Sequence, residues 1–71
     1  MKDEPFLKKL GKKIVKLRDE RGISQMELAR RLGTGNSQIR LIEVGDANPT
    51  IKTLLKIAQE LEVSVSELVN I

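Results

Sequence analysis

The chain has 71 residues and a formal net charge of +3, with 13 Lys and Arg against 10 Asp and Glu. This length predicts a single small domain. The sequence contains no cysteine and no histidine, which excludes a disulfide framework, a thiolate zinc site and the commonest general base. We therefore expect no enzyme, no metal and no cofactor. No apolar run approaches the ~18–20 residues that span a bilayer, and residues 1–10 are unlike a secretory signal, so we expect a cytoplasmic protein without membrane contact.

The charges are unevenly distributed along the chain. From Pro5 to Ile42 there are ten Lys or Arg against three Asp or Glu, whereas from Glu43 to the end there are two against five. A cationic part of this kind is typical of proteins that bind a polyanion such as nucleic acid. Solvated helix faces would give the same counts, and the lysines from Lys8 to Lys16 are spread around their helix. With one aromatic residue in the chain, binding of single strands by base stacking is not expected.

The first expected helix runs from about Pro5 to Glu20, because proline suits the first helical position and Gly22 follows the end as a C-cap. Gly11 costs ~1 kcal/mol relative to alanine inside a helix, and we interpret it as the joint between a frayed first turn and the stable helix. The apolar residues at helical spacing form the expected buried stripe: Leu7, Leu10, Ile14 and Leu17.

Two short helices follow. Ser24 and Glu27 form a capping box, S-x-x-E, at the start of the second helix, and Gly33 ends it. The third helix covers about Asn36–Val44 and ends at Gly45. Isolated helices this short are marginal in water, so the two must pack on each other and on the rest of the chain. Their expected inward-facing residues are Leu28, Ala29, Leu32, Ile39 and Ile42.

The last two expected helices are also marked by caps. The fourth begins after Asn48-Pro49 with Thr50 as its cap and runs to about Leu61. The fifth opens with a second capping box, from Ser64 to Glu67, which argues for helix despite the strand-like alternation in VSVSELV. Their expected apolar faces are Leu54, Leu55, Ala58 and Leu61 in the fourth helix and Val65, Leu68 and Val69 in the fifth.

The connection between the second and third helices is very short. Gly33 and Thr34, with or without Gly35, join them, so the helices must cross steeply and closely. A small residue is needed at the crossing and a residue that tolerates positive φ in the turn, and Ala29 and Gly33 meet these needs. This is the helix-turn-helix pattern. The predicted fold is therefore all-α, one five-helix repressor-like domain over 1–71 with its core at about 7–68.

On these residues the chain resembles the helix-turn-helix family of the phage repressors, Cro proteins and XRE-type regulators. The matching segments are LGKKIVKLRDERGISQMELARRLG and IRLIEVGDANPTIKTLLKIAQELEVSVSEL, from about Leu7 to Leu68. The resemblance implies a transcriptional regulator that binds double-stranded DNA sequence-specifically, with the third helix in the major groove. Two positions depart from the family. Gly35 replaces the usual Ser or Thr cap, and Glu62 replaces a frequent glycine and is expected at positive φ.

The third helix is the expected recognition helix. Ile39 and Ile42 define its buried side, and the residues expected to contact bases lie opposite or beside that side: Asn36, Ser37, Arg40, Leu41 and Val44. By resemblance, Asn36, Ser37 and Leu41 hold the base-reading positions. Asparagine can pair with adenine, arginine with guanine or a phosphate, and apolar side chains with thymine methyl groups. The alternative is that Leu41 and Val44 fill one side of the core.

Four residues are candidates for contact with DNA phosphates. The resemblance implies two roles for Gln25, which are to bind a phosphate and to brace the recognition helix. The first role also has a physical basis, because the start of a helix favours an anion. The alternative is an ordinary surface glutamine. Thr34, Gly35 and Asn48 flank the recognition helix and are weaker candidates, because turn formation and capping explain them equally well.

Arg18 and Glu43 are expected to form a structural ion pair. They lie beside the buried stripes of the first and third helices, and relatives often join these positions. The pair would hold the recognition helix in place.

One recognition helix reads only a few base pairs, so we expect a homodimer through the fourth and fifth helices. Val65, Val69 and Ile71 are the expected interface residues. The alternative is that Val69 and Ile71 close the monomer core over the first helix. No small-molecule effector is expected in so short a chain. The rival functional class is an antitoxin-type or other protein-interaction module that binds a partner protein as well as DNA.

Overall fold

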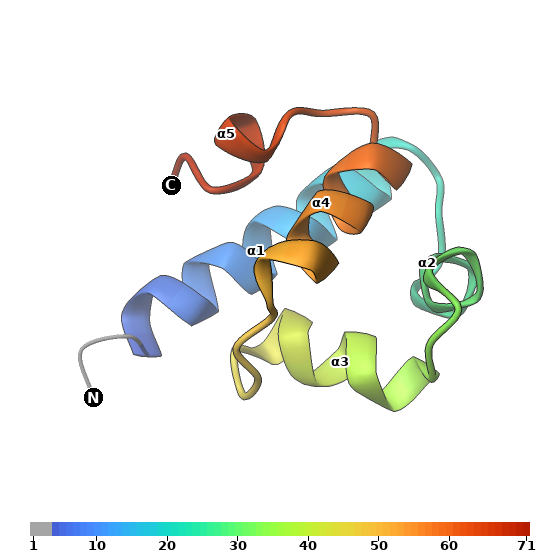
Figure 1. Cartoon of the computed structure of the whole chain (residues 1–71), viewed down its shortest axis with the longest axis horizontal. Helices are drawn as coiled ribbons and strands as arrows, with labels where there is room; N and C mark the ends of the chain where they lie inside the picture. Colours follow the sequence, from blue (N-terminus) through green and yellow to red (C-terminus); the bar gives the residue numbers. More distant parts are fainter. Residues whose placement is uncertain (1–3) are drawn as a thin grey trace.

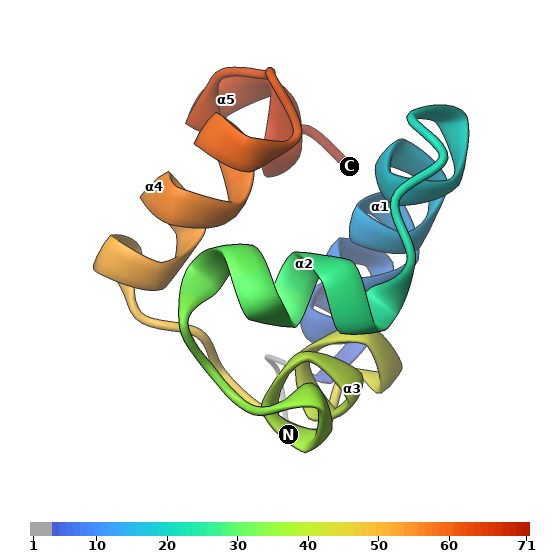
Figure 2. The same ribbon diagram turned by 90° about the vertical axis from the view of Figure 1, so that its right-hand side faces the viewer.

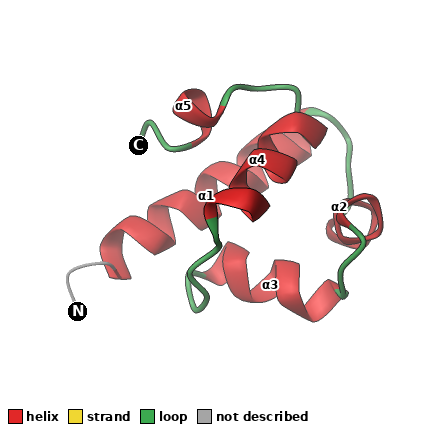
Figure 3. Ribbon diagram, viewed as in Figure 1, coloured by secondary structure: helices red, strands yellow, loops and turns green. Residues whose placement is uncertain are grey.

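The computed structural model describes residues 4–71, and over this range it contains five helices and no strand. The helices are α1 (Glu4–Glu20), α2 (Gln25–Leu32), α3 (Asn36–Val44), α4 (Ile51–Glu60) and α5 (Val65–Leu68) (Figures 1 and 3). The all-α prediction is confirmed. None of the helices in the described part is long and apolar enough to cross a membrane.

The helices contact one another in a closed circuit. α1 packs on α3, α3 on α2, α2 on α4, α4 on α5, and α5 returns to α1. Figure 2 shows α2 between α1 and α4, with α3 beneath it. The apolar faces of all five helices therefore meet in one core, and the short helices α2 and α3 gain from this packing the stability they lack alone.

The core contains most of the residues that periodicity assigned to it. Leu32, Val65 and Val69 are only partly buried against it. Leu7, predicted for the buried stripe of α1, is partly exposed and does not belong to the core, so that prediction is wrong. Leu55 is the clearest exception, because 54% of its surface is exposed, and the prediction that it faces inward is wrong. It lies about 100° round the helix from Leu54, whereas Ile57 shares the stripe of Leu54 and is fully buried. The buried apolar residues are Leu10, Ile14, Leu17, Ile23, Leu28, Ala29, Ile39, Ile42, Leu54, Ile57, Ala58, Leu61 and Leu68.

The predicted N-caps of α2, α4 and α5 are confirmed. The Ser24 hydroxyl accepts a hydrogen bond of 3.0 Å from the backbone N–H of Glu27, and the hydroxyls of Thr50 and Ser64 accept equivalent bonds. The glutamate half of the first capping box differs from expectation. The Glu27 carboxylate accepts hydrogen bonds from Arg30 and Arg31 on the next turn.

Gly11 marks a close helix contact, and its interpretation as the joint of a frayed turn is wrong. α1 continues through it without a break. A Cβ at this position would lie 2.7 Å from the carbonyl carbon of Glu43 and 2.8 Å from the carbonyl oxygen of Ile42. Glycine therefore lets α1 approach the backbone of the last turn of α3. Elsewhere, Glu62 has φ of 60°, as its departure from the family pattern predicted.

Candidate nucleic-acid interface

The turn between α2 and α3 consists of three residues and has the predicted form. Gly33 adopts φ of 70°, and the N–H of Thr34 donates to the carbonyl of Ala29 at 3.0 Å. Gly35 is the N-cap of α3 with φ of −78°, and its missing side chain leaves that cap without a side-chain hydrogen bond. The steep crossing in Figure 2 follows from this short turn.

The outer face of α3 is exposed and mixes polar with apolar groups. Leu41 is 43% exposed and Val44 50%, so the alternative in which they fill the core is wrong. Ile39 and Ile42 are buried on the opposite side, as predicted. Asn36, Ser37 and Arg40 are also exposed. A shallow hollow of about 450 Å³ lies on this face, lined by Ser37, Arg40, Leu41, Val44 and Asp46.

The predicted ion pair between Arg18 and Glu43 is present. Arg18 Nε lies 2.8 Å from Glu43 Oε2 and Nη2 lies 3.2 Å from Oε1, so the guanidinium binds the carboxylate through two nitrogens. A third nitrogen, Nη1, donates to the carbonyl of Ile23 at 2.9 Å. The Glu43 side chain is only 4% exposed, so this pair fixes α3 against α1 from inside the protein.

Gln25 connects this ion pair to the outer face. Its Nε2 donates to Glu43 Oε1 at 2.9 Å, and its Oε1 accepts a 3.3 Å hydrogen bond from Asn36 Nδ2. Gln25 therefore braces both ends of α3, the role that the resemblance implied. It is not an ordinary surface glutamine.

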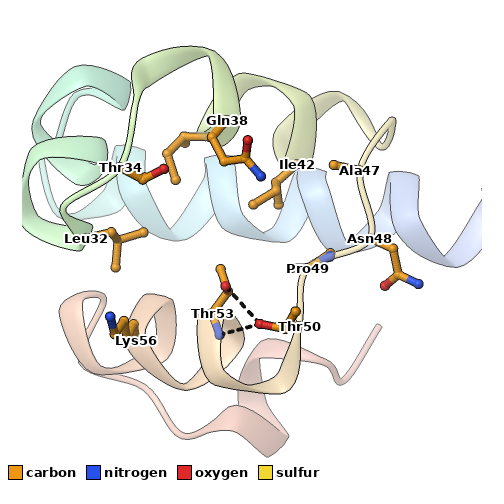
Figure 4. A pocket seen from close by; sticks show the side chains of 11 residues that line it. Leu32, Thr34, Gln38, Ile42, Ala47, Asn48, Pro49, Thr50, Thr53 and Lys56 are labelled. Atoms are coloured by element: carbon orange, nitrogen blue, oxygen red, sulfur yellow. Dashed lines mark hydrogen bonds between the residues drawn. The ribbon is translucent and has the colours of Figure 1, made fainter.

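Thr34 and Asn48 lie at opposite ends of a second cavity, of about 220 Å³, between α3 and α4 (Figure 4). On the α4 side, Thr50 Oγ1 and Thr53 Oγ1 are hydrogen-bonded at 3.0 Å. Gly35 is not among the residues that line this cavity. The sequence reasoning missed two polar residues here, Gln38 and Lys56. Nothing in their spacing distinguishes them from ordinary solvent-exposed positions.

Part of the positive charge of α2 is locally neutralised. The side-chain hydrogen bonds from Arg30 and Arg31 lower the pKa of Glu27 to about 2, and the same contact raises the pKa of Arg30. Arg31 also lies 3.8 Å from Glu60 of α4. These arginines stabilise α2 and its contact with α4, which leaves Arg40 as the cation in the hollow on α3.

The residues predicted for a dimer interface have different surroundings. Val65 and Val69 are partly buried against the core of their own chain, whereas Ile71 is 46% exposed. The sequence reasoning missed two apolar residues of α4, Ile51 and Leu55, which are 69% and 54% exposed. Their spacing of four residues places them on one face of α4 and is a signal that could have identified them.

Comparison with known proteins agrees with this geometry. The model of the helix-turn-helix family HTH_3 matches residues 14–68. The chain belongs to this family of XRE-type transcriptional regulators. It is 40% identical over 63 residues to the uncharacterized HTH-type transcriptional regulator y4dJ of Sinorhizobium fredii, an alignment that covers 89% of this chain and 82% of the relative.

Two solved structures of helix-turn-helix proteins share the fold. The restriction-modification controller protein C.AhdI from Aeromonas hydrophila superposes with a TM-score of 0.84 at 34% identity, covering 87% of this chain and 94% of that one. The biofilm master regulator SinR in complex with DNA superposes with a TM-score of 0.78 at 38% identity, covering 83% and 95%. The relatives of this HTH_3 protein are thus regulators and not enzymes.

Proposed function

We propose that this HTH_3 protein binds double-stranded DNA sequence-specifically and regulates transcription, with α3 in the major groove. The observation that carries the proposal is the outer face of α3, where Leu41 and Val44 are exposed beside polar groups. Exposed apolar side chains cost free energy in water, and thymine methyl groups in the major groove would cover them. The SinR structure, solved with DNA, supports the same use of a similar fold.

Each residue of the outer face has a role in this proposal. Asn36 pairs with adenine through its carboxamide, and Arg40 reaches guanine or a phosphate. Leu41 and Val44 contact thymine methyl groups, while Ser37 hydrogen-bonds to a base edge. The hydrogen bond from Asn36 to Gln25 limits the rotation of the Asn36 carboxamide before DNA arrives, which lowers the entropic cost of binding.

Phosphates on either side of the groove would be held by residues around α3. Gln25 stands at the first turn of α2, where backbone N–H groups and the helix dipole favour an anion. Thr34 and Gly35 precede α3, and Asn48 follows it. Contacts of this kind fix the register of the protein on the duplex and carry no sequence information themselves.

We also propose that the functional unit is a homodimer in which α4 and α5 meet their counterparts. The exposed pair Ile51 and Leu55 provides the apolar area, with Ile71 beside α5 and the outer edges of Val65 and Val69 completing the interface. A two-fold arrangement would place the two copies of α3 in successive major grooves, about one helical turn apart. The concentration of the protein would then control regulation, because dimerisation depends on it.

The test is selection of bound duplexes from a random DNA pool at moderate salt. The expected result is enrichment of an inverted repeat whose half-sites lie about one turn apart. Enrichment of a single half-site would support specific binding and count against the dimer. If no sequence is enriched and binding simply fades as salt rises, the proposal is wrong. The α4–α5 surface would then be tested for a protein partner, as the antitoxin-type alternative requires.

A further inference from the structure

We infer that Asp46 is a specificity-determining residue, whose carboxylate accepts a hydrogen bond from the exocyclic amino group of a cytosine or adenine in the major groove. This inference rests on the proposed function, since it concerns the DNA face of α3. Asp46 lines the same hollow as Ser37, Arg40, Leu41 and Val44.

The backbone fixes the position of Asp46. Its N–H donates to the carbonyl of Leu41 at 2.9 Å, which closes the last turn of α3. The preceding residue, Gly45, has φ of 87°, and a Cβ there would lie 2.9 Å from the Cα of Lys8 on α1. The chain therefore leaves α3 along one defined path, and the exposed side chain of Asp46 is held at the edge of the hollow.

The carboxylate of Asp46 stands just beyond the C-terminal end of α3. The carbonyl end of α3 carries partial negative charge, so a carboxylate beside it is unfavourable. No Lys or Arg among the side chains that the structure describes pairs with Asp46 within 4 Å. Within residues 4–71, therefore, no ion pair accounts for an aspartate at this edge, and its place in the lining of the hollow favours a role in binding.

Docked DNA restricts what can approach this carboxylate. An ionised carboxylate only accepts hydrogen bonds, and phosphates repel it. In the major groove the amino groups of cytosine N4 and adenine N6 are the donors, whereas guanine and thymine present acceptors there. Burial between Leu41, Val44 and the DNA would remove water from the carboxylate, so a base without a donor would leave it unpaired, at a cost. Asp46 would thus reject guanine and thymine at one position.

The experiment uses the duplex selected by the unchanged protein, altered one base pair at a time, with dissociation constants measured for Asp46→Ala and for Glu62→Ala. Glu62 is the charge-matched control, because it belongs to the connection between α4 and α5. Figure 1 shows this connection on the side of the molecule away from α3. We expect the unchanged protein to prefer an amino-bearing base at one position by about tenfold. Asp46→Ala should lose that preference and bind unrelated duplexes more tightly, whereas Glu62→Ala should keep it.

Asp46→Asn supplies a second variant with nearly the same shape. Its carboxamide keeps an acceptor and adds a donor, so it should tolerate guanine at the same position. The preference of the unchanged protein for cytosine or adenine at this position identifies which base donates to Asp46. If Asp46→Ala keeps every base preference of the unchanged protein, the inference is wrong while the proposed function stands. If the unchanged protein selects no sequence at all, both are wrong.

Discussion

The Gln25 carboxamide donates a 2.9 Å hydrogen bond to the buried carboxylate of Glu43, and so ties the first turn of α2 to the last turn of α3. The same carboxylate is held by Arg18 of α1, and Gln25 accepts from Asn36 at the start of α3. Two helices, α1 and α2, therefore fix the orientation of α3 through one acidic group. The position of the proposed recognition surface depends on this group as well as on the apolar core.

Substitution of Glu43 by alanine should lower both stability and DNA affinity. It leaves the guanidinium of Arg18, whose side chain is only 12% exposed, without its partner, which typically costs about 3–5 kcal/mol. In a 71-residue domain a loss of this size should lower the melting temperature by more than 10 °C. An unchanged melting temperature would show that the pair has no structural role.

The double variant Arg18→Met, Glu43→Leu separates stability from positioning. Apolar residues of similar volume often replace a buried ion pair without loss of stability. This variant should therefore melt near the unchanged protein yet bind DNA more weakly, because Gln25 loses its acceptor. Full DNA affinity in a stably folded double variant would mean that the core alone positions α3.

Gln25→Ala should weaken DNA binding more than it weakens folding. One partly exposed hydrogen bond is worth about 1 kcal/mol to stability, and Glu43 keeps its bonds to Arg18. DNA affinity should fall further, because the variant removes the proposed phosphate contact and frees the Asn36 carboxamide. Met26→Ala is the matched control, in the same turn of α2 but with its side chain exposed.

Coupling between Gln25 and Asn36 can be measured directly. In a double-mutant cycle on DNA binding, the effects of Gln25→Ala and Asn36→Ala should not add, because each removes part of one hydrogen-bonded unit. Strict additivity would show that the 3.3 Å hydrogen bond plays no part in recognition.

Gly11→Ala should destabilise the protein, against the usual sign for a glycine inside a helix. In an open helix the change gains about 1 kcal/mol. Here the new methyl group would press on the backbone of Ile42 and Glu43, and such overpacking typically costs about 1–3 kcal/mol. Thermal or urea denaturation would give the sign.

Gly35→Ser is the matched substitution with the opposite expectation. Gly35 has an extended conformation that serine adopts readily, and a Cβ there would have its nearest neighbour at 4.0 Å. The added hydroxyl can cap α3, and a good cap is worth roughly a few tenths of a kcal/mol over glycine. The outcome that would contradict the expectation for the first glycine is a stabilising Gly11→Ala. It would show that the close approach of α1 to α3 is relaxed in solution.

Sequence reasoning was most successful where the evidence was local. Caps such as Ser24 and the exposure of Leu41 follow from spacing within one or two helical turns. The Arg18–Glu43 pair spans 25 residues, and the family resemblance, not periodicity, supplied it. The acceptor of the Gln25 amide was not predicted, because it depends on the rotation of α2 relative to α3 across the turn.

Two interpretations failed because the sequence does not reveal what lies across a helix contact. Gly11 was interpreted from its low helix propensity, whereas its position is explained by the backbone of Glu43, 32 residues away. Leu55 was assigned to the core because it recurs at helical spacing with Ala58, three residues later. The actual stripe runs through Ile57, which leaves Leu55 exposed.

The Glu27 cluster predicts how stability depends on pH. The pKa of Glu27 is about 2 in the folded protein and 4.5 without its partners, so the carboxylate stabilises the fold fully above pH 4.5. That contribution should fade as the pH drops from 4.5 toward 2. Melting temperatures measured over this window should therefore fall less steeply for Glu27→Gln than for the unchanged protein. Parallel curves would show that the arginines do not hold the carboxylate in solution.

Leu55→Glu tests the proposed dimer. Leu55 is more than half exposed, so an acidic residue there should leave the monomer folded. In a dimer through α4 and α5 the two new carboxylates would lose water at the interface, at high cost. Sedimentation at high concentration, with and without DNA, should show a dimer for the unchanged protein and a monomer for Leu55→Glu.

Met26→Glu is the control for this last substitution, since Met26 is an exposed apolar residue in the first turn of α2, a helix outside the proposed interface. It should leave the oligomeric state unchanged in the absence of DNA. If the unchanged protein sediments only as a monomer, the exposed residues Ile51 and Leu55 do not join two copies of this chain. An inverted repeat in the selected DNA would then have to arise from two monomers that bind independently, with no coupling between the half-sites. Titration of single and double half-site duplexes separates the cases, because a dimer binds the double site far more tightly.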